Sequence, residues 1–118
     1  MREIMAIIRM NKIQQTKDAL AEAGCPCLTA IKVFGRGKQK GLYLNPLGNV
    51  EPDNKKAEIR FIPKRLLTLV VEDESVPSVV DTIMRINRTG MIGDGRIFVC
   101  PINDAVRVRT GEKGNDAL

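Results

Sequence analysis

Two amphipathic segments, each set between short apolar runs, constrain the fold of this chain more than any other feature of its sequence. In residues 11–24 and 75–90 the apolar side chains recur at helical spacing. The expected cap and stop residues are Asn11 and Gly24 for the first segment and Ser75 and Gly90 for the second, with Pro77 tolerated in a first turn. The pattern therefore predicts two amphipathic helices.

Four apolar or β-branched runs surround these helices and are typical of strands, at residues 4–8, 28–34, 66–71 and 96–102. The order is βαββαβ, which predicts an α+β fold of the ferredoxin-like type, with an antiparallel sheet and both helices on one face. The other face is left uncovered. Its apolar content predicts self-association, so we expect a homo-oligomer.

The chain loses its periodicity between the second and third strands. From Leu42 to about Ile59, turn-forming residues and charges predominate, which predicts a long exposed loop. Loops of this length inside compact domains tend to be functional, so we expect this one to be a contact arm for a partner. A short extended piece at residues 106–108 and a polar tail from about residue 110 to 118 follow the last strand.

Length and composition indicate one globular domain. The chain has 118 residues, of which 43% are hydrophobic and 28% charged, enough for a single core without disulfides. No apolar run is long enough to span a bilayer and no signal-peptide pattern is present, so we expect a cytoplasmic protein. Three cysteines in an odd pattern favour free thiols. The absence of histidine excludes Ser-His and Cys-His catalysis.

The net charge of +5 and a pI near 9.4 predict an acidic partner. Readers of single-stranded nucleic acid need aromatic platforms, and this chain has one tyrosine, three phenylalanines and no tryptophan. The charge therefore favours phosphorylated or carboxylate small molecules over bases, and we expect no nucleic acid and no membrane insertion.

Residues 35–41 hold three glycines and three cations directly after the second strand. Glycines expose backbone N–H groups, so this segment is suited to hold an anion such as a phosphate. It lacks the Walker A pattern, and the alternative of a solvated basic loop stays open at this point. Similar basic or Gly-rich clusters lie at residues 64–65, 89–96 and 107–109. Convergence of a few of their hydrogen bonds on a polyphosphate would give roughly micromolar affinity.

The segment 89–99, Thr-Gly-Met-Ile-Gly-Asp-Gly-Arg-Ile-Phe-Val, closely resembles the C-terminal signature of the PII nitrogen-regulatory signal-transduction family. Residues 107–112 resemble the family's R-x-R-T-G-E ending, and residues 18–24 and 38–41 also resemble their family counterparts. The resemblance covers the chain except for the long loop. It implies a regulator rather than an enzyme: a trimer whose inter-subunit clefts bind ATP or ADP competitively, with Mg²⁺ and 2-oxoglutarate joining ATP.

The resemblance also implies a set of site residues. Those expected to hold the nucleotide from one subunit are Gly35, Gly37, Lys38, Gln39, Gly93, Asp94, Gly95 and Arg96, with Ile7 against the base and Thr89 nearby. Those expected from the neighbouring subunit are Thr29, Val70, Arg107 and Arg109, the two arginines gripping phosphates. Gln39 would ligate Mg²⁺. The residues expected at 2-oxoglutarate are Gln39, Lys40, Lys64 and Gly93.

The segment from about residue 37 to 62 corresponds to the family's T-loop, the arm that contacts target proteins. It is longer than usual, its middle lacks the tyrosine that is uridylylated in many members, and Lys38 replaces a common arginine. These departures resemble the nitrogenase-associated PII-like subfamily, in which two paralogues together inhibit dinitrogenase and 2-oxoglutarate relieves the inhibition. The expected target is therefore dinitrogenase, approached as a homotrimer or with a paralogous subunit.

The sequence also allows other functions. Within the same family, the alternative targets are glutamine synthetase and an ammonium channel. From another class, an RNA-binding βαββαβ module is conceivable because residues 95–99 faintly resemble an RNP-type strand, although stacking aromatics are lacking. An enzyme is disfavoured because no nucleophile and base pair can be assembled from these residues.

Overall fold

The computed structural model describes residues 1–37, 42–43, 58–59 and 61–118. The elements in chain order are β1 (Arg2–Arg9), a 3₁₀ turn (Met10–Lys12), α1 (Ile13–Glu22), β2 (Thr29–Gly35), β3 (Leu42–Tyr43), β4 (Glu58–Ile59), β5 (Ile62–Val71), a 3₁₀ turn (Asp73–Ser75), α2 (Val76–Asn87), β6 (Arg96–Pro101) and a final 3₁₀ turn (Gly114–Ala117).

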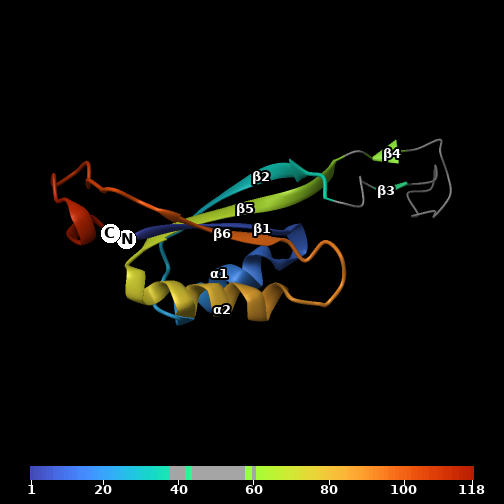
Figure 1. The fold of residues 1–118 in the computed structure, drawn as a ribbon, viewed down its shortest axis with the longest axis horizontal. Helices are drawn as coiled ribbons and strands as arrows, with labels where there is room; N and C mark the ends of the chain where they lie inside the picture. Colours follow the sequence, from blue (N-terminus) through green and yellow to red (C-terminus); the bar gives the residue numbers. More distant parts are fainter. Residues whose placement is uncertain (38–41, 44–57, 60) are drawn as a thin grey trace.

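The main sheet has the strand order β2-β5-β1-β6, and each neighbouring pair is antiparallel. Both helices lie on one face of it (Figure 1). This arrangement confirms the α+β, ferredoxin-like prediction. β3 and β4 pair separately, with Leu42 opposite Ile59 and Tyr43 opposite Glu58, at the two ends of the predicted loop. The rest of that loop lies outside the described residues.

The core forms where the helices cover the central strands. In β1 every second side chain is buried, with Ile4, Ala6 and Ile8 at most 1% exposed, and Leu67 and Leu69 of β5 face the same way. The helices complete the cluster with Leu20, Val79 and Ile83. The apolar run 4–8 predicted a central strand, and β1 lies between β5 and β6.

One buried polar contact joins the two helices. The Asn87 side-chain amide donates to Thr16 Oγ1 at 3.0 Å and to the Ile83 carbonyl at 2.9 Å, while the Thr16 hydroxyl donates to the Lys12 carbonyl at 2.7 Å. Such a contact stabilises the packing because buried polar groups otherwise lose their hydrogen bonds to water.

The expected helix starts differ from those observed. Asn11 lies inside a 3₁₀ turn, and α1 begins at Ile13. Ser75 does precede α2, but its side chain makes no capping hydrogen bond. The reason is shared: a 3₁₀ turn runs into each helix, so the residue at the cap position already has helical dihedral angles rather than the extended ones that a side-chain cap needs.

The helix ends agree with the prediction at one helix only. Gly24, with φ +86°, follows α1 in the left-handed conformation as expected. α2 ends at Asn87, before the expected stop at Gly90, because Arg88 turns to the extended conformation with ψ 119°. Within the described ranges, neither helix has the length and apolar character needed to cross a membrane.

Strands β1 and β5 are longer than the apolar runs that predicted them. β5 begins at Ile62 rather than Leu66, because Lys64 and Arg65 pair across to both β1 and β2. The sheet face away from the helices is apolar in its middle, where the register places the side chains Met5, Ile7, Ile31, Leu66 and Phe98. Of these, Ile31 is 51% exposed and Phe98 43%.

Candidate functional site

The predicted site residues gather at one end of the sheet, which we call the loop end. It comprises the ends of β1 and β2, the starts of β5 and β6, and the segment 88–95 that joins α2 to β6. Here Arg9 is opposite Lys64 and Ile7 is opposite Arg96. The ladder thus brings together side chains that are far apart in the sequence.

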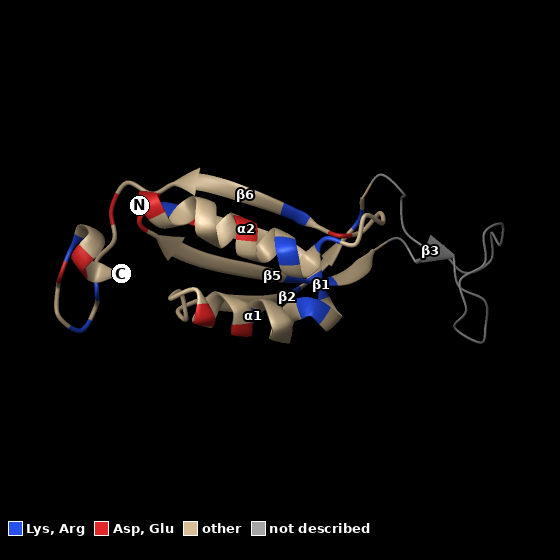
Figure 2. Ribbon diagram, turned by 90° about the horizontal axis from the view of Figure 1, so that it is seen from below, with Lys and Arg blue, Asp and Glu red and all other residues tan. Residues whose placement is uncertain are grey.

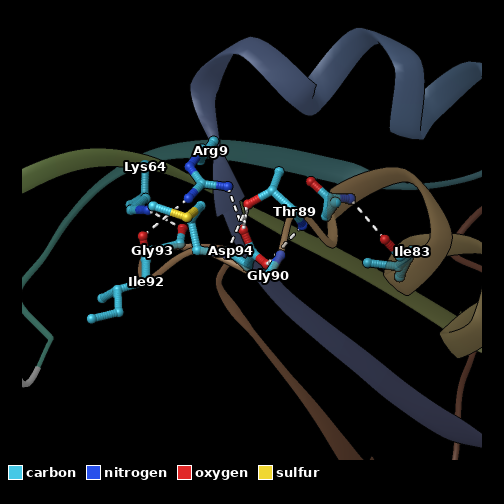
Figure 3. A network of polar contacts seen from close by, with 10 residues as sticks. Arg9, Lys64, Ile83, Thr89, Gly90, Ile92, Gly93 and Asp94 are labelled. Atoms are coloured by element: carbon cyan, nitrogen blue, oxygen red, sulfur yellow. Dashed lines mark hydrogen bonds and ion pairs between the residues drawn. The ribbon is translucent and has the colours of Figure 1, made fainter.

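Asp94 organises the segment 88–95 (Figure 3). Its carboxylate accepts hydrogen bonds from the Thr89 backbone N–H at 2.8 Å, the Gly90 N–H at 3.0 Å, the Thr89 hydroxyl and the Arg9 guanidinium at 2.6 Å. The hydrogen bond from the Thr89 hydroxyl, followed by that from Arg9, holds the pKa of Asp94 well below its ordinary value. Asp94 is therefore ionised, and its oxygens are committed to shaping the segment.

Two further contacts fasten this segment to the sheet. Arg9 Nη2 donates to the Ile92 carbonyl at 3.1 Å, and Lys64 Nζ donates to the Gly93 carbonyl at 2.7 Å. Desolvation lowers the pKa of Lys64, the neighbouring Arg9 lowers it further, and Asp94 opposes the change. The segment is thus held by β1 on one side and β5 on the other.

Gly95 and Gly93 allow this close approach. Gly95 has φ +113°, and a Cβ added there would overlap the Ile7 carbonyl oxygen. Gly93 has φ +100°, and its added Cβ would lie 3.3 Å from Arg9 Nη2. Both positions therefore need glycine for the backbone conformation, and Gly95 also needs it for space.

The loop end is positively charged. Figure 2 shows cationic positions at the end of α2, the start of β6 and the neighbouring end of β1. The loop-end cations include Arg9, Lys64, Arg88 and Arg96, and the acid Asp94 pairs with Arg9. This arrangement can bind an anion, since Lys64 and Arg96 carry charge that Asp94 does not neutralise by direct pairing in the described part of the chain.

The tail after β6 folds on itself at the opposite end of the molecule. Arg107 pairs with Glu112, and its Nη2 donates to the Asp116 and Leu118 carbonyls at 3.2 and 3.0 Å. A single bridge joins Val106 to Lys113. The predicted polar tail is therefore an ordered turn around Arg107.

The remaining predicted residues are far from the loop end within one chain. Thr29 and Gly35 stand at opposite ends of β2, and Lys64 and Val70 are six positions apart in β5. At about 3.3 Å per residue, each pair is separated by roughly 20 Å. Arg107 and Arg109 follow the end of β6, where Cys100 pairs with Glu3, the residue that pairs with Val70 on the other side. Figure 1 shows the tail at this end of the sheet. We call the region of Thr29, Val70 and the tail the tail end.

The structure thus divides the predicted residues into two groups. Those at the loop end are Ile7, Gly35, Gly37, Lys64, Thr89, Gly93, Asp94, Gly95 and Arg96. Those at the tail end are Thr29, Val70, Arg107 and Arg109. Lys38, Gln39 and Lys40 lie outside the described residues.

Sequence reasoning missed Arg9, which holds both Asp94 and Ile92. The only signal in the sequence was a cation at the end of a buried apolar run. No group of three His, Cys, Asp or Glu side chains suited to a metal ion occurs in residues 1–37, 42–43, 58–59 or 61–118. The cysteines Cys25, Cys27 and Cys100 are free thiols.

Comparison with known proteins gives consistent matches over the whole chain. Residues 1–112 match the family described as "Nitrogen regulatory protein P-II". A protein of Methanobacterium ivanovii named "Nitrogen fixation nifHD region GlnB-like protein 2" is 52% identical, over all of this chain and 99% of the relative. Its namesake in Methanococcus maripaludis is 49% identical over the full length of both. "Nitrogen regulatory protein P-II 2" of Methanothermobacter thermautotrophicus is 42% identical, over all of this chain and 97% of the relative.

Proposed function

Because the chain belongs to the nitrogen regulatory protein P-II family, we propose that it senses effectors at clefts between the subunits of a homotrimer. Each cleft binds ATP or ADP, and 2-oxoglutarate joins ATP and Mg²⁺. Members of this family are regulatory signal-transduction proteins, and we propose that this chain, too, acts by binding rather than by catalysis.

The observation that carries the proposal is the separation of the predicted residues into two groups roughly 20 Å apart. One ligand cannot touch both groups in a single subunit. A loop end of one copy can meet the tail end of the next, and such head-to-tail contacts close into a ring. The uncovered apolar sheet face around Ile7 and Leu66 favours the same assembly, since it gains by burial.

Each group has a distinct role in the proposed cleft. At the loop end, Lys64 and Arg96 supply charge, and Gly93 and Gly95 let the backbone approach the ligand. Thr29, Val70, Arg107 and Arg109 reach the ligand from the neighbouring copy. Lys38, Gln39 and Lys40 complete the set, with Gln39 binding Mg²⁺ through its side-chain oxygen. Asp94 contributes by holding the segment 88–95 in place, because its oxygens are occupied by Thr89, Gly90 and Arg9.

We propose dinitrogenase as the target, contacted through the arm at residues 37–62. The support is the relatives' name, which places those proteins in a nitrogen fixation nifHD region. Effector binding at the base of the arm changes its grip on the target. By linkage, a target held more tightly without 2-oxoglutarate must weaken 2-oxoglutarate binding.

The first test is calorimetric titration of the purified protein with 2-oxoglutarate, with and without Mg-ATP. We expect binding only when Mg-ATP is present, and light scattering should give the mass of a trimer. No binding in either condition would overturn the proposed sensing chemistry.

The division of the cleft between two copies has its own test. The Arg96→Ala and Arg109→Ala variants should each lose nucleotide affinity about tenfold or more, since each removes one charged contact. When the two variants are co-expressed, some clefts combine an intact loop end with an intact tail end. Part of the high-affinity binding should therefore return, and failure to recover it would place both groups in one subunit.

A further inference from the structure

An aromatic side chain lies exposed where the contact arm begins. Phe34, near the end of β2, is 71% exposed, although large apolar side chains are normally covered. It pairs in the ladder with Pro63 of β5. Phe61, just before β5, is 55% exposed. Phe34 and Pro63 lie on the helix-bearing side of the sheet. At this end, β2 and β5 reach past the ends of the helices, so the helices do not cover them (Figure 1).

Cations surround this apolar spot. Lys32 and Arg65 form the neighbouring rung of the ladder and lie on the same side of the sheet as Phe34 and Pro63. We call these four residues the root face. No Asp or Glu occurs in residues 23–37 or 61–71, which carry Lys32, Arg36, Lys64 and Arg65. The charge of the root face is therefore not balanced by an acid from its own strands.

We propose that the root face is a second docking surface for the protein that the arm contacts, and that it takes an apolar spot rimmed by carboxylates. This inference rests on the proposed function. The reasons are complementarity of charge and position. Protein interfaces combine an aromatic or apolar anchor with a polar rim, and exposed apolar patches with charged borders commonly mark them. A target gripped by the arm must also pass close to its base.

The test compares variants for binding to three purified proteins: dinitrogenase, glutamine synthetase and an ammonium channel. Lys32→Glu reverses a charge of the root face, and Arg85→Glu reverses a charge on the exposed side of α2 as a matched control. Phe34→Ser removes the apolar anchor, while Phe34→Leu keeps it. Phe34 is largely exposed, so neither change should unfold the protein.

We expect Lys32→Glu and Phe34→Ser to weaken target binding about tenfold, because an apolar anchor or a charge pair that binding buries at the centre of an interface carries much of the affinity. Arg85→Glu and Phe34→Leu should bind nearly as wild type, and all four should keep wild-type titrations with Mg-ATP and 2-oxoglutarate. Equal target affinity of all variants and the wild type would overturn the docking surface alone.

Two other outcomes would also contradict the inference. If the wild type binds effectors but none of the three proteins, the proposed targets and the root face fail together. If Lys32→Glu instead weakens binding of a single-stranded oligonucleotide while target binding is unchanged, the root face serves nucleic acid. If the wild type does not bind the effectors, the proposed function itself is contradicted. Failure of the proposed function and failure of the root face are therefore distinguishable.

Discussion

The loop end and the tail end present their charged groups in opposite ways. At the loop end, contacts join residues distant in the sequence: Arg9 to Asp94 across 85 positions and Lys64 to Gly93 across 29. In the tail, Arg107 contacts residues only 5, 9 and 11 positions away. The first geometry is set by the folding of the subunit. The second is a local turn, which in the proposed assembly would reach the ligand of the next copy.

The two ends also differ in which cation is paired with a carboxylate. At the loop end the Asp94 carboxylate pairs with Arg9 and, among the residues that the structure describes, with neither Lys64 nor Arg96. In the tail, Glu112 pairs with Arg107, one of the two arginines proposed to grip phosphates. A phosphate bound by Arg107 as proposed would compete with Glu112 for the Nη1 group, whereas Asp94 pairs with Arg9, which is not among the residues proposed to hold the ligand.

The largest effect is expected from Gly95→Ala, which breaks the loop end. A left-handed φ costs an alanine about 1–2 kcal/mol. Overlap with the Ile7 carbonyl adds a further cost of about 1–3 kcal/mol, because the backbone of a central strand cannot move freely. Urea denaturation should therefore show a loss of about 2–5 kcal/mol in the free energy of unfolding.

Gly90→Ala is the matched control for this change. Gly90 also has a positive φ, of +82°, but an added Cβ there would meet nothing within 4 Å. Its cost should be only about 1–2 kcal/mol. Equal losses in the two variants would show that the close approach of Gly95 to β1 is unimportant.

The next largest effect is expected from Asp94→Asn, which keeps the shape of the side chain but removes its charge. The amide cannot satisfy Thr89, Gly90 and Arg9 together, because it has a single acceptor oxygen. Nucleotide affinity should fall about tenfold as the segment 88–95 loosens. Calorimetry should show this loss, while Asp81→Asn on the exposed face of α2 should change little.

The pH dependence of stability separates the wild type further from the Asp94→Asn variant. The pKa of Asp94 is held far below its unfolded value, so its stabilising effect is complete above about pH 4 and is lost as the pH falls towards the folded-state pKa. The difference in stability between wild type and Asp94→Asn should therefore shrink in acid. A difference that stays constant from pH 6 to pH 2 would contradict the ionised, hydrogen-bonded state of Asp94.

Sequence patterns predicted the element order and the central place of β1 because apolar periodicity reflects burial directly. By resemblance they also predicted residues 89–96 as part of the candidate site. They could not show that Arg9 reaches Asp94, because no local pattern links residues that meet only after the sheet has formed. The caps failed for a similar reason: Asn11 and Ser75 have suitable side chains, but the 3₁₀ turns that precede the helices change the backbone there.

A smaller effect, in the opposite direction, is expected from Glu112→Gln in the tail. This change releases Arg107 from its pair, which is half-exposed and so contributes only about 0.2–1 kcal/mol. Nucleotide affinity should rise about two- to fivefold. Glu22→Gln at the end of α1 alters net charge equally and serves as the control. Unchanged or weaker nucleotide binding by Glu112→Gln would mean that the ion pair with Glu112 does not compete with the nucleotide for Arg107 but holds Arg107 in position for it.

The smallest effect concerns the protonation of Lys64 at the loop end. Desolvation and the neighbouring Arg9 lower its pKa, so its charge is lost at a lower pH than that of an ordinary lysine. 2-Oxoglutarate affinity, measured with saturating Mg-ATP, should therefore begin to fall at a lower pH than the titration of an ordinary lysine would give. Lys64→Arg keeps its charge at every pH in this range, so its affinity, although lower because of altered geometry, should stay level. If the wild type and Lys64→Arg respond to pH in parallel, groups other than Lys64 hold the 2-oxoglutarate carboxylate. The loop end would then bind only the nucleotide.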